Sequence, residues 1–409
     1  MPAKYKMQKN LYVVLAIMTL IIYNSNTTFA QVIPATFGNG LKINGLDSTF
    51  YLRIGFRFQN QVVAEWNLTD ERLGFEASND VRALVRRSRV KFDGWAYSPR
   101  LKYKLELALA NSGTGGNNTQ NFNSTANIIL DAFVEYNFYK GLSLKFGQAK
   151  LAGNRERVLS SGDLQFVDRS RLNSRFNIDR DLLFELSHEN TIGESVIVRK
   201  SASISTGEGR NHLTGTNNGF GYTYRLEILP FGSFQDKGDY VGSDILKENT
   251  PKLAVGFTYD NNNQAGRERG QNGNFIINSE GDIVGKDLNT FFADMMFKIQ
   301  GYSIMIEYVD KAADNGPLVI DENDTIIGTY YTGSAYNINA GYMVSGDTEV
   351  ALRYTDISAD TATDERHYTI GLNKFFVGHK LKLQTDFTFI DRAQEQNTTM
   401  WRTQLEIHF

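Results

Sequence analysis

Residues 49–60, TFYLRIGFRFQN, alternate between apolar and polar side chains with a period of two. One face carries only apolar side chains, namely Phe50, Leu52, Ile54, Phe56 and Phe58. The other face carries Tyr51, Arg53, Gly55, Arg57 and Gln59. Successive side chains of a strand point to opposite faces, so the segment predicts a β-strand with one apolar and one charged face. Strands of a soluble β-sandwich have the same pattern, so the number and length of the other strands must distinguish a sandwich from a membrane β-barrel.

The same alternation returns along the whole chain. The further segments are 83–96, 100–110, 128–138, 142–149, 182–188, 196–206, 219–229, 252–260, 289–299, 302–310, 334–344, 347–357, 366–376, 379–390 and 400–408. The total of sixteen is even, as in single-chain bacterial outer-membrane barrels. About ten residues at roughly 3.3 Å each, tilted near 45°, span about 23 Å, which matches the apolar band of such a barrel. Arg199 and Lys200 fall on both faces of one segment, which predicts either a bulge there or an error in the assigned register.

The connections alternate between short and long. Short ones cover 97–99, 139–141, 300–301, 345–346 and 377–378, with 231–251 as the exception. Long ones cover 61–82, 111–127, 150–181, 261–288 and 311–333. Short periplasmic turns and long external loops are typical of outer-membrane barrels. We therefore predict an all-β fold, a transmembrane antiparallel β-barrel of sixteen strands over residues 49–409.

The N-terminus has the pattern of a secretory signal peptide over residues 1–30. Lys4, Lys6 and Lys9 precede an apolar run at 11–22, and Ala30 offers the small residue that cleavage needs. The alternative is a membrane anchor, but about 12 apolar residues fall short of the roughly 20 that span a bilayer. Residues 31–48 are then a short periplasmic segment before the barrel.

The last strand alternates as well and ends in an aromatic residue. Trp401, Thr403, Leu405, Ile407 and Phe409 share one face. A terminal strand of this kind resembles the signal that the outer-membrane assembly machinery recognises, and the alternative is an ordinary final strand. With the signal peptide, it predicts a multi-pass protein of the Gram-negative outer membrane in contact with lipid.

Residues 150–180, KLAGNRERVLSSGDLQFVDRSRLNSRFNIDR, interrupt the run of strands. The segment lacks strand alternation and an apolar helical stripe, and it carries Arg155, Arg157, Arg169, Arg171, Arg175 and Arg180. Loops of this length inside a compact domain are uncommon and usually functional. We interpret the segment as a constriction loop folded into the barrel, while a solvated surface loop is the alternative.

Composition restricts the function further. Removing residues 1–30 takes away three lysines and no acid, so the net charge of −3 becomes −6. An acidic chain argues against nucleic-acid binding, and any anion site must be a local cluster. Without cysteines there are no disulfides and no thiolate metal sites. The five histidines are scattered, so we expect no metal, no cofactor, no catalytic residue and no enzyme activity.

Two stretches, residues 86–110 and 144–182, resemble the phosphate-selective porin O and P family. The resemblance implies a trimer of sixteen-stranded barrels, in which the third external loop narrows the pore. It also implies a row of lumen arginines that leads to a lysine cluster near the periplasm, with phosphate or polyphosphate as solute.

The candidate anion-binding residues follow from the alternation and the loop. Inward positions on the strands are Arg53, Arg57, Arg87, Arg89, Lys91, Lys102, Lys104 and Lys145. The loop contributes Arg155, Arg157, Arg169, Arg171 and Arg175. Arginine suits oxyanions because its planar fork donates two parallel hydrogen bonds. Acidic residues share this wall, so the alternative is that the charges pair with one another and hold the loop in place.

We therefore predict an outer-membrane porin that passes small hydrophilic solutes by facilitated diffusion and prefers anions. The alternative function is a non-conducting barrel that serves adhesion or a partner scaffold. External connections under about 35 residues are too short for an independent folded domain, which favours the porin.

Overall fold

The computed structural model describes residues 31–33, 36–68, 75–76, 80–110, 127–211 and 219–409. The predicted signal peptide, residues 1–30, lies outside the described residues. Within the described part, no helix is long and apolar enough to cross a membrane.

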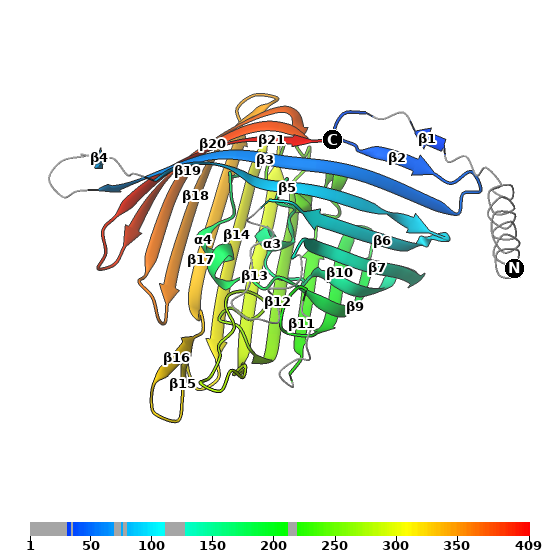
Figure 1. Cartoon of the computed structure of the whole chain (residues 1–409). Coiled ribbons are helices and arrows are strands. Elements are labelled where there is room, and N and C mark those ends of the chain that lie inside the picture. The colour runs from blue at the N-terminus through cyan, green and yellow to red at the C-terminus, as the bar shows by residue number, and fades with distance from the viewer. Residues whose placement is uncertain (1–30, 34–35, 69–74, 77–79, 111–126, 212–218) are drawn as a thin grey trace, which may run out of the picture.

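Sixteen strands form a closed antiparallel barrel (Figure 1). They are β3 (Phe50–Leu68), β5 (Val81–Ala96), β6 (Ser98–Ala108), β7 (Ile129–Tyr139), β8 (Leu142–Lys150), β9 (Arg180–Ile192), β10 (Val196–Ser205), β11 (Gly221–Leu229), β12 (Lys252–Ala265), β13 (Lys286–Ile299), β14 (Tyr302–Ala313), β17 (Gly333–Met343), β18 (Thr348–Ala359), β19 (Glu365–His379), β20 (Leu381–Arg392) and β21 (Thr398–His408). Each pairs with the next, and β21 pairs with β3 to close the ring. Closure leaves no long sheet edge, so the predicted fold is confirmed.

The alternation separates the two faces of the wall as predicted. Aromatic rings on the outer face stack across neighbouring strands, as Phe146 does with Phe184 and Tyr302 with Tyr342, both at 4.3 Å between centroids. Inward positions carry polar side chains, among them Asp294 and Glu307. The apolar face therefore meets lipid while the polar face lines the lumen.

Two details of the strands differ from expectation. β3 continues to Leu68, eight residues beyond the predicted end at residue 60. The bulge predicted at Arg199 and Lys200 was wrong, since β10 pairs in regular register with both β9 and β11. Arg199 turns inward to ion pairs with Glu227 at 3.0 Å and with Asp239, whereas Lys200 lies exposed on the other face.

The N-terminal segment adds two short strands outside the ring of sixteen. β1 (Gln31–Ile33) pairs with β2 (Leu41–Asn44), and β2 pairs with β3 over Tyr51–Ile54. β21 pairs with β3 only from Arg57 onward, so β2 continues the wall past the C-terminus. The external side carries β4 (Phe75–Glu76), which pairs with the end of β3, and a hairpin of β15 (Leu318–Ile320) and β16 (Ile326–Thr329).

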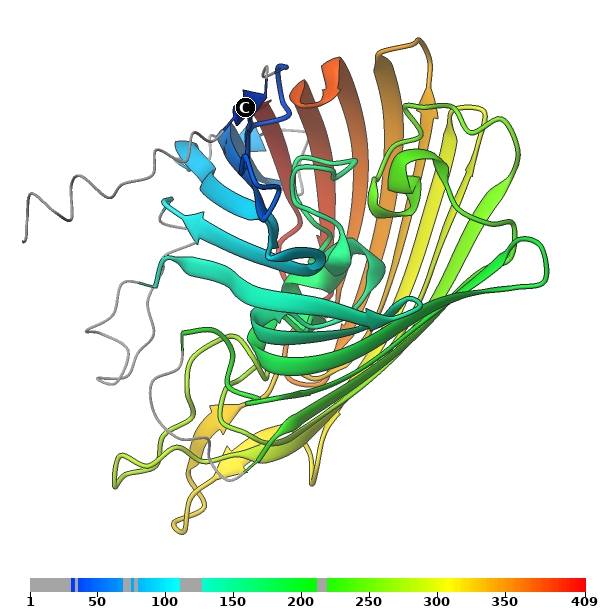
Figure 2. The same cartoon turned by 90° about the vertical axis from the view of Figure 1, so that its right-hand side faces the viewer.

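The segment between β8 and β9 folds into the lumen; we call residues 151–179 the inward loop. It contains two short helices that the sequence did not indicate, α3 (Arg155–Val158) and α4 (Arg171–Phe176), both inside the ring of strands (Figures 1 and 2). The loop buries Leu151, Leu172, Phe176 and Ile178 against inward-facing apolar residues of the wall, namely Phe292, Val309, Ala335 and Ile357.

A second segment enters the lumen from the opposite end. Residues 230–251 join β11 to β12 on the side of the short turns and include η2 (Gln235–Tyr240). The Gly242 N–H donates to the Asp163 carbonyl of the inward loop at 2.8 Å. The inward loop is also held by hydrogen bonds to side chains of β13, β14 and β18–β20. Two of the lumen cavities lie toward β3 and β5–β9. A third lies between the inward loop and β18–β21, and it reaches β3 and β5.

Candidate functional site

Three cavities lie between the inward loop and the barrel wall. The inner cavity, about 420 Å³, lies at the end of the short turns and is lined by Gly38, Arg53 and Phe409 among others. The outer cavity, about 580 Å³, lies toward the long loops. Between them is a neck of about 170 Å³. The neck shares Arg89 and Arg180 with the inner cavity and five residues with the outer cavity, so the three cavities adjoin; we call them together the passage.

The neck is strongly basic. Its described lining contains seven arginines, namely Arg86, Arg87, Arg89, Arg157, Arg169, Arg180 and Arg210. Asp179 is the one carboxylate among the described residues that line it. Burial, with Arg169 and Arg180 nearby, lowers the pKa of Arg157 well below its ordinary value. Five of the seven arginines form ion pairs, namely Arg86 and Arg87 with Asp168, Arg89 with Glu106, Arg157 with Asp179 and Arg180 with Asp131. Guanidinium groups still outnumber these carboxylates, so an anion in the neck would relieve the repulsion that remains.

The outer cavity contains arginine and no lysine among its described lining residues. Its arginines are Arg86, Arg87, Arg157, Arg169, Arg171, Arg269, Arg353, Arg392 and Arg402. Four carboxylates lie among them, namely Glu65, Asp168, Asp179 and Glu365. The excess of guanidinium groups makes this cavity suited to planar or tetrahedral oxyanions.

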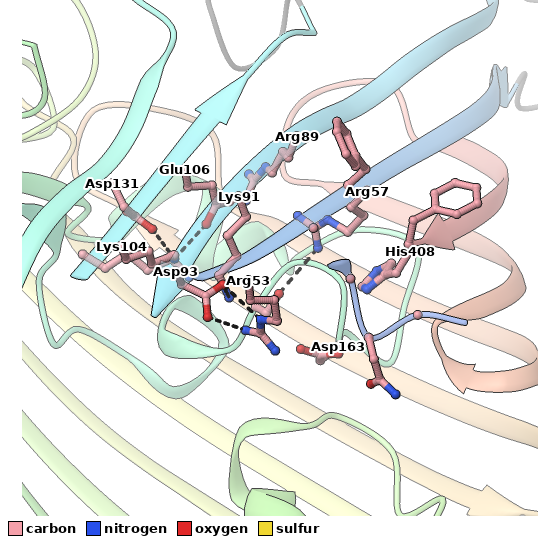
Figure 3. A pocket seen from close by; sticks show the side chains of 18 of the residues that line it. Arg53, Arg57, Arg89, Lys91, Asp93, Lys104, Glu106, Asp131, Asp163 and His408 are labelled. Atoms are coloured by element: carbon pink, nitrogen blue, oxygen red, sulfur yellow. Dashed lines mark hydrogen bonds and ion pairs between the residues drawn. The ribbon is translucent and has the colours of Figure 1, made fainter. Parts of the chain in front are cut away.

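The inner cavity is rich in lysine and more evenly balanced in charge (Figure 3). Its cations are Arg53, Arg57, Arg89, Arg180, Lys91, Lys104, Lys145, Lys150 and Lys380, against Asp93, Glu106, Asp131 and Asp163. Arg53 donates to both oxygens of Asp93, at 3.2 and 2.7 Å, and Lys91 lies 3.3 Å from the same carboxylate. Lys104 lies between Glu106, at 2.7 Å, and Asp131. Asp93, Glu106 and Asp131 are each shared by two cations, so positive charge remains in excess.

Most of the predicted strand residues do line the passage. Arg53, Arg57, Arg89, Lys91, Lys104 and Lys145 line the inner cavity, and Arg87 lines the neck and the outer cavity. Lys102 is exposed and lines none of the three cavities. Of the loop residues, Arg157 and Arg169 line the neck and the outer cavity, while Arg171 lines the outer cavity.

Arg155 and Arg175 lie away from the passage, so the expectation that they meet a solute is corrected. Arg155 is fully buried, with Nε 3.0 Å from Asp294 and Nη2 in contact with Glu227. Arg175 is also buried and lies over the Tyr331 ring at 5.0 Å. Burial removes both side chains from solvent. The ion pairs of Arg155 with β11 and β13 hold the inward loop in place, as the alternative interpretation expected.

Arg169 and Arg171 have different partners although they are two positions apart. Arg171 donates to both oxygens of Glu365, at 3.1 and 2.7 Å. Arg169 donates to the backbone carbonyls of Glu156 and Leu159, both at 2.8 Å, and no carboxylate of the described residues lies within ion-pair distance of it. Carbonyl oxygens fix the guanidinium without cancelling its charge. Arg169 is therefore the loop arginine with the most effective charge toward the passage.

Sequence reasoning missed several residues of the site. They are Arg86, Lys150, Arg210, Arg269, Arg353, Arg392 and Arg402. Arg180 was named in the arginine-rich segment but not among the candidate anion-binding residues, and Lys150 is the first residue of that segment. Arg86 sits at a bulge that alternation cannot reveal. Arg402 and Arg392 belong to the final strands, which lie next to the wall of β3 only after closure.

Comparison with known proteins identifies the family. The family model of phosphate-selective porin O and P matches residues 56–406. The chain belongs to this family. An uncharacterized protein of Aquifex aeolicus (strain VF5) is 25% identical over 300 residues, covering 68% of this chain and 67% of that protein.

Solved structures support the barrel. This porin resembles OmpTdeltaL8, a loop L8 deletion mutant of OmpT from Vibrio cholerae, with TM-score 0.52, 14% identity, and coverage of 88% of this chain and 100% of that chain. It also resembles Salmonella typhi OmpF in complex with daunomycin, with TM-score 0.54, 11% identity, and coverage of 88% and 98%. At such identities the likeness shows the fold alone. The family and the fold together indicate a channel of the Gram-negative outer membrane rather than an enzyme.

Proposed function

We propose that this porin passes small oxyanions, such as phosphate or polyphosphate, by facilitated diffusion along the basic wall of its lumen. The observation that carries the proposal is the neck, where seven arginines surround about 170 Å³ and Asp179 is the one described carboxylate in the lining. A cation that enters this space meets repulsion, whereas an anion meets several guanidinium donors.

The size of the effect can be estimated from one arginine. At 4 Å and an effective dielectric near 20, one guanidinium attracts a monovalent anion by about 4 kcal/mol before desolvation is subtracted. If about a quarter of this remains, permeation is biased roughly fivefold toward anions, since about 1.4 kcal/mol corresponds to a factor of ten. Conduction also needs release. The shared carboxylates of the inner cavity keep its cations from holding an anion too tightly.

The passage is ordered by side-chain type. Guanidinium groups dominate the outer cavity and the neck, and ammonium groups outnumber them in the inner cavity. Arginine binds two oxygens of one anion, while lysine acts as a compact point charge on a flexible stem. An oxyanion that enters from outside therefore moves from bidentate partners toward partners that exchange more readily.

Planar-bilayer recording tests the proposal. With a KCl gradient, the reversal potential should show a preference for chloride over potassium, and phosphate added at constant chloride should reduce the chloride current at low concentration. A measurable conductance without anion preference would contradict the proposal. A folded barrel with no conductance would support the alternative of an adhesion or scaffold protein.

Three chains per assembly, which the family resemblance implies, should appear as conductance steps in multiples of three and in the mass of the detergent-solubilised complex.

A further inference from the structure

The external hairpin of β15 and β16 is apolar on both of its faces. β15 consists only of Leu318, Val319 and Ile320, and β16 begins with Ile326 and Ile327. In a strand with one face in water, apolar and polar residues alternate, whereas a strand that is covered on both faces reads as a continuous apolar run. The hairpin therefore has the sequence of a sheet whose two faces are both covered.

One face is covered by the chain itself. Val319 is 3% exposed and packs with Ile276 and Tyr330 in an apolar cluster of the external side. The Lys286 ammonium group donates to the backbone carbonyl of Leu318 at 2.8 Å. These contacts hold the hairpin on the barrel, so its second face is presented in a defined orientation and does not have to be ordered when a partner binds.

The second face is uncovered. Leu318, Ile320 and Ile326 are 38%, 53% and 57% exposed. Ile320 lies directly opposite Ile326 in the hairpin, and Leu318 shares its face because side chains two positions apart in a strand point the same way. The hairpin lies beyond the ends of the barrel strands, where water rather than lipid surrounds it (Figures 1 and 2). Contiguous apolar surfaces in water mark interaction sites.

The charge of the hairpin selects the class of partner. Residues 312–329 contain no lysine, arginine or histidine and four carboxylates, namely Asp314, Asp321, Glu322 and Asp324. None of the four forms an ion pair with a described residue. A second copy of the hairpin, a phosphate headgroup and a nucleic acid would each be repelled, whereas a basic partner would be attracted.

We propose that the free face of the β15–β16 hairpin is a docking surface for a basic, amphipathic segment of an extracellular protein or peptide. Branched aliphatic side chains of that segment cover Leu318, Ile320 and Ile326, and lysine or arginine side chains at one end meet the carboxylates of the hairpin tip. An extended segment suits the surface, because alternate side chains of a strand form one apolar row. The inference is independent of the proposed function, since it does not involve the passage.

The small size of the surface determines the kind of binding to expect. The apolar face consists of three side chains, so the contact area is well below that of a stable protein–protein interface and binding should be weak and transient. The carboxylates of the tip are exposed, so their attraction for a basic partner should be screened by salt.

Fluorescence anisotropy of a labelled peptide tests the docking surface, with the assembled porin in detergent. The probe is a peptide of three lysines followed by three Ser-Val repeats. We expect saturable binding that weakens as salt rises, and roughly tenfold weaker binding of a peptide in which glutamates replace the lysines. Absence of binding by the probe, or equal binding of the two peptides, would overturn the proposal.

Substitutions locate the binding on the hairpin. Ile320→Ser should weaken binding of the probe about fivefold, because it removes apolar surface from the middle of the face. Glu322→Gln should weaken it about threefold and reduce its dependence on salt. Leu246→Ser and Glu194→Gln are the matched controls, because both residues are exposed at the opposite end of the barrel, and binding should change by less than about twofold. Equal effects of hairpin and control variants would contradict the site.

Other occupants of this face give different results. If lipid covers it, the probe binds the porin in detergent but not in lipid vesicles. If a second copy covers it, Ile320→Ser lowers the mass of the detergent-solubilised complex. Either result would overturn the proposal.

Carbodiimide coupling keeps the proposal testable if Ile320→Ser does not assemble. The reagent joins a lysine amine to a carboxylate, and mass spectrometry of proteolytic fragments should find the probe on Glu322 or Asp324 of the wild-type porin. Coupling that is equally frequent at Glu194 would contradict the docking surface. The reversal potential of Ile320→Ser should equal that of wild type, so failure of this inference leaves the proposed function untouched.

Discussion

The backbone N–H of Gly242 donates to the carbonyl oxygen of Asp163 at 2.8 Å. This bond joins two segments that enter the lumen from opposite ends of the barrel, residues 230–251 and the inward loop. The two segments support each other and fill part of the lumen, and the passage runs beside them. Because Asp163 also lines the inner cavity, the width of the passage depends on a contact at its edge.

The first prediction concerns this contact. A Cβ atom at Gly242 would lie 2.6 Å from the backbone nitrogen of Gln165, so Gly242→Ala must displace the inward loop. We expect larger single-channel conductance and weaker anion preference in planar bilayers. Gly346→Ala is the control, because a Cβ atom there meets nothing within 4 Å. Equal behaviour of the two variants would show that the contact does not set the width of the passage.

The second prediction separates structural from solute-facing arginines. Arg155→Met leaves Asp294 and Glu227 buried without one of their cations, which typically costs about 3–5 kcal/mol. Arg82→Met breaks an exposed pair with Glu65, at 2.5 Å, and should cost about 1 kcal/mol or less. Urea unfolding of the refolded barrel, followed by tryptophan fluorescence, measures both free energies. Similar losses would mean that Arg155 is not an anchor of the loop.

The third prediction tests the outer face. Leu352 is 57% exposed in the middle of β18, where the account places lipid. Leu352→Arg should lower the folding free energy of the barrel in a bilayer by about 2–4 kcal/mol. Ile320 on the external hairpin is 53% exposed, and Ile320→Arg should be nearly neutral because water surrounds it. Refolding into lipid vesicles, with heat-modifiable mobility as the readout, distinguishes the two; equal costs would contradict the assigned membrane position.

The fourth prediction concerns pH. The pKa of Asp168 is lower in the folded protein than in the unfolded chain, where it is about 3.9. Its ion pairs therefore contribute stability that is complete above the unfolded pKa and is lost as pH falls toward the folded pKa. The difference in urea midpoint between wild type and Asp168→Asn should shrink as pH falls below about 4. A difference that stays constant down to pH 2 would show that Asp168 is not held in its ionised form by Arg86 and Arg87.

Alternation along the chain was enough to predict the barrel because each strand has one lipid-facing and one lumen-facing side. It also placed Arg87, Lys104 and most other strand cations on the correct wall. Arg86 escaped this reasoning, since a bulge depends on pairing between strands and not on the local pattern. The expected bulge at Arg199 is absent for a related reason. Two consecutive cations fit a regular strand when one points inward and the other outward.

The inward loop shows the limit of sequence reasoning for the site. Arg155 and Arg169 look alike in the sequence, yet one is buried against Asp294 and the other faces the neck. The partner of Arg155 lies 139 positions away, and only closure of the barrel brings it near. Arg169 and Arg171 also look alike in the sequence, and which of them is paired with a carboxylate could be read only from the structure.

The central claim is that arginines facing the neck make this porin prefer anions. The most direct measurement is the reversal potential under a KCl gradient for wild type, Arg169→Glu and Arg175→Glu. Arg169 faces the neck, whereas Arg175 is stacked on Tyr331 away from it, so the two variants carry the same charge change at different places. We expect an anion-preferring wild type, a marked shift toward cations in Arg169→Glu, and little shift in Arg175→Glu. Equal shifts in both variants, or a wild type without preference for anions, would contradict it.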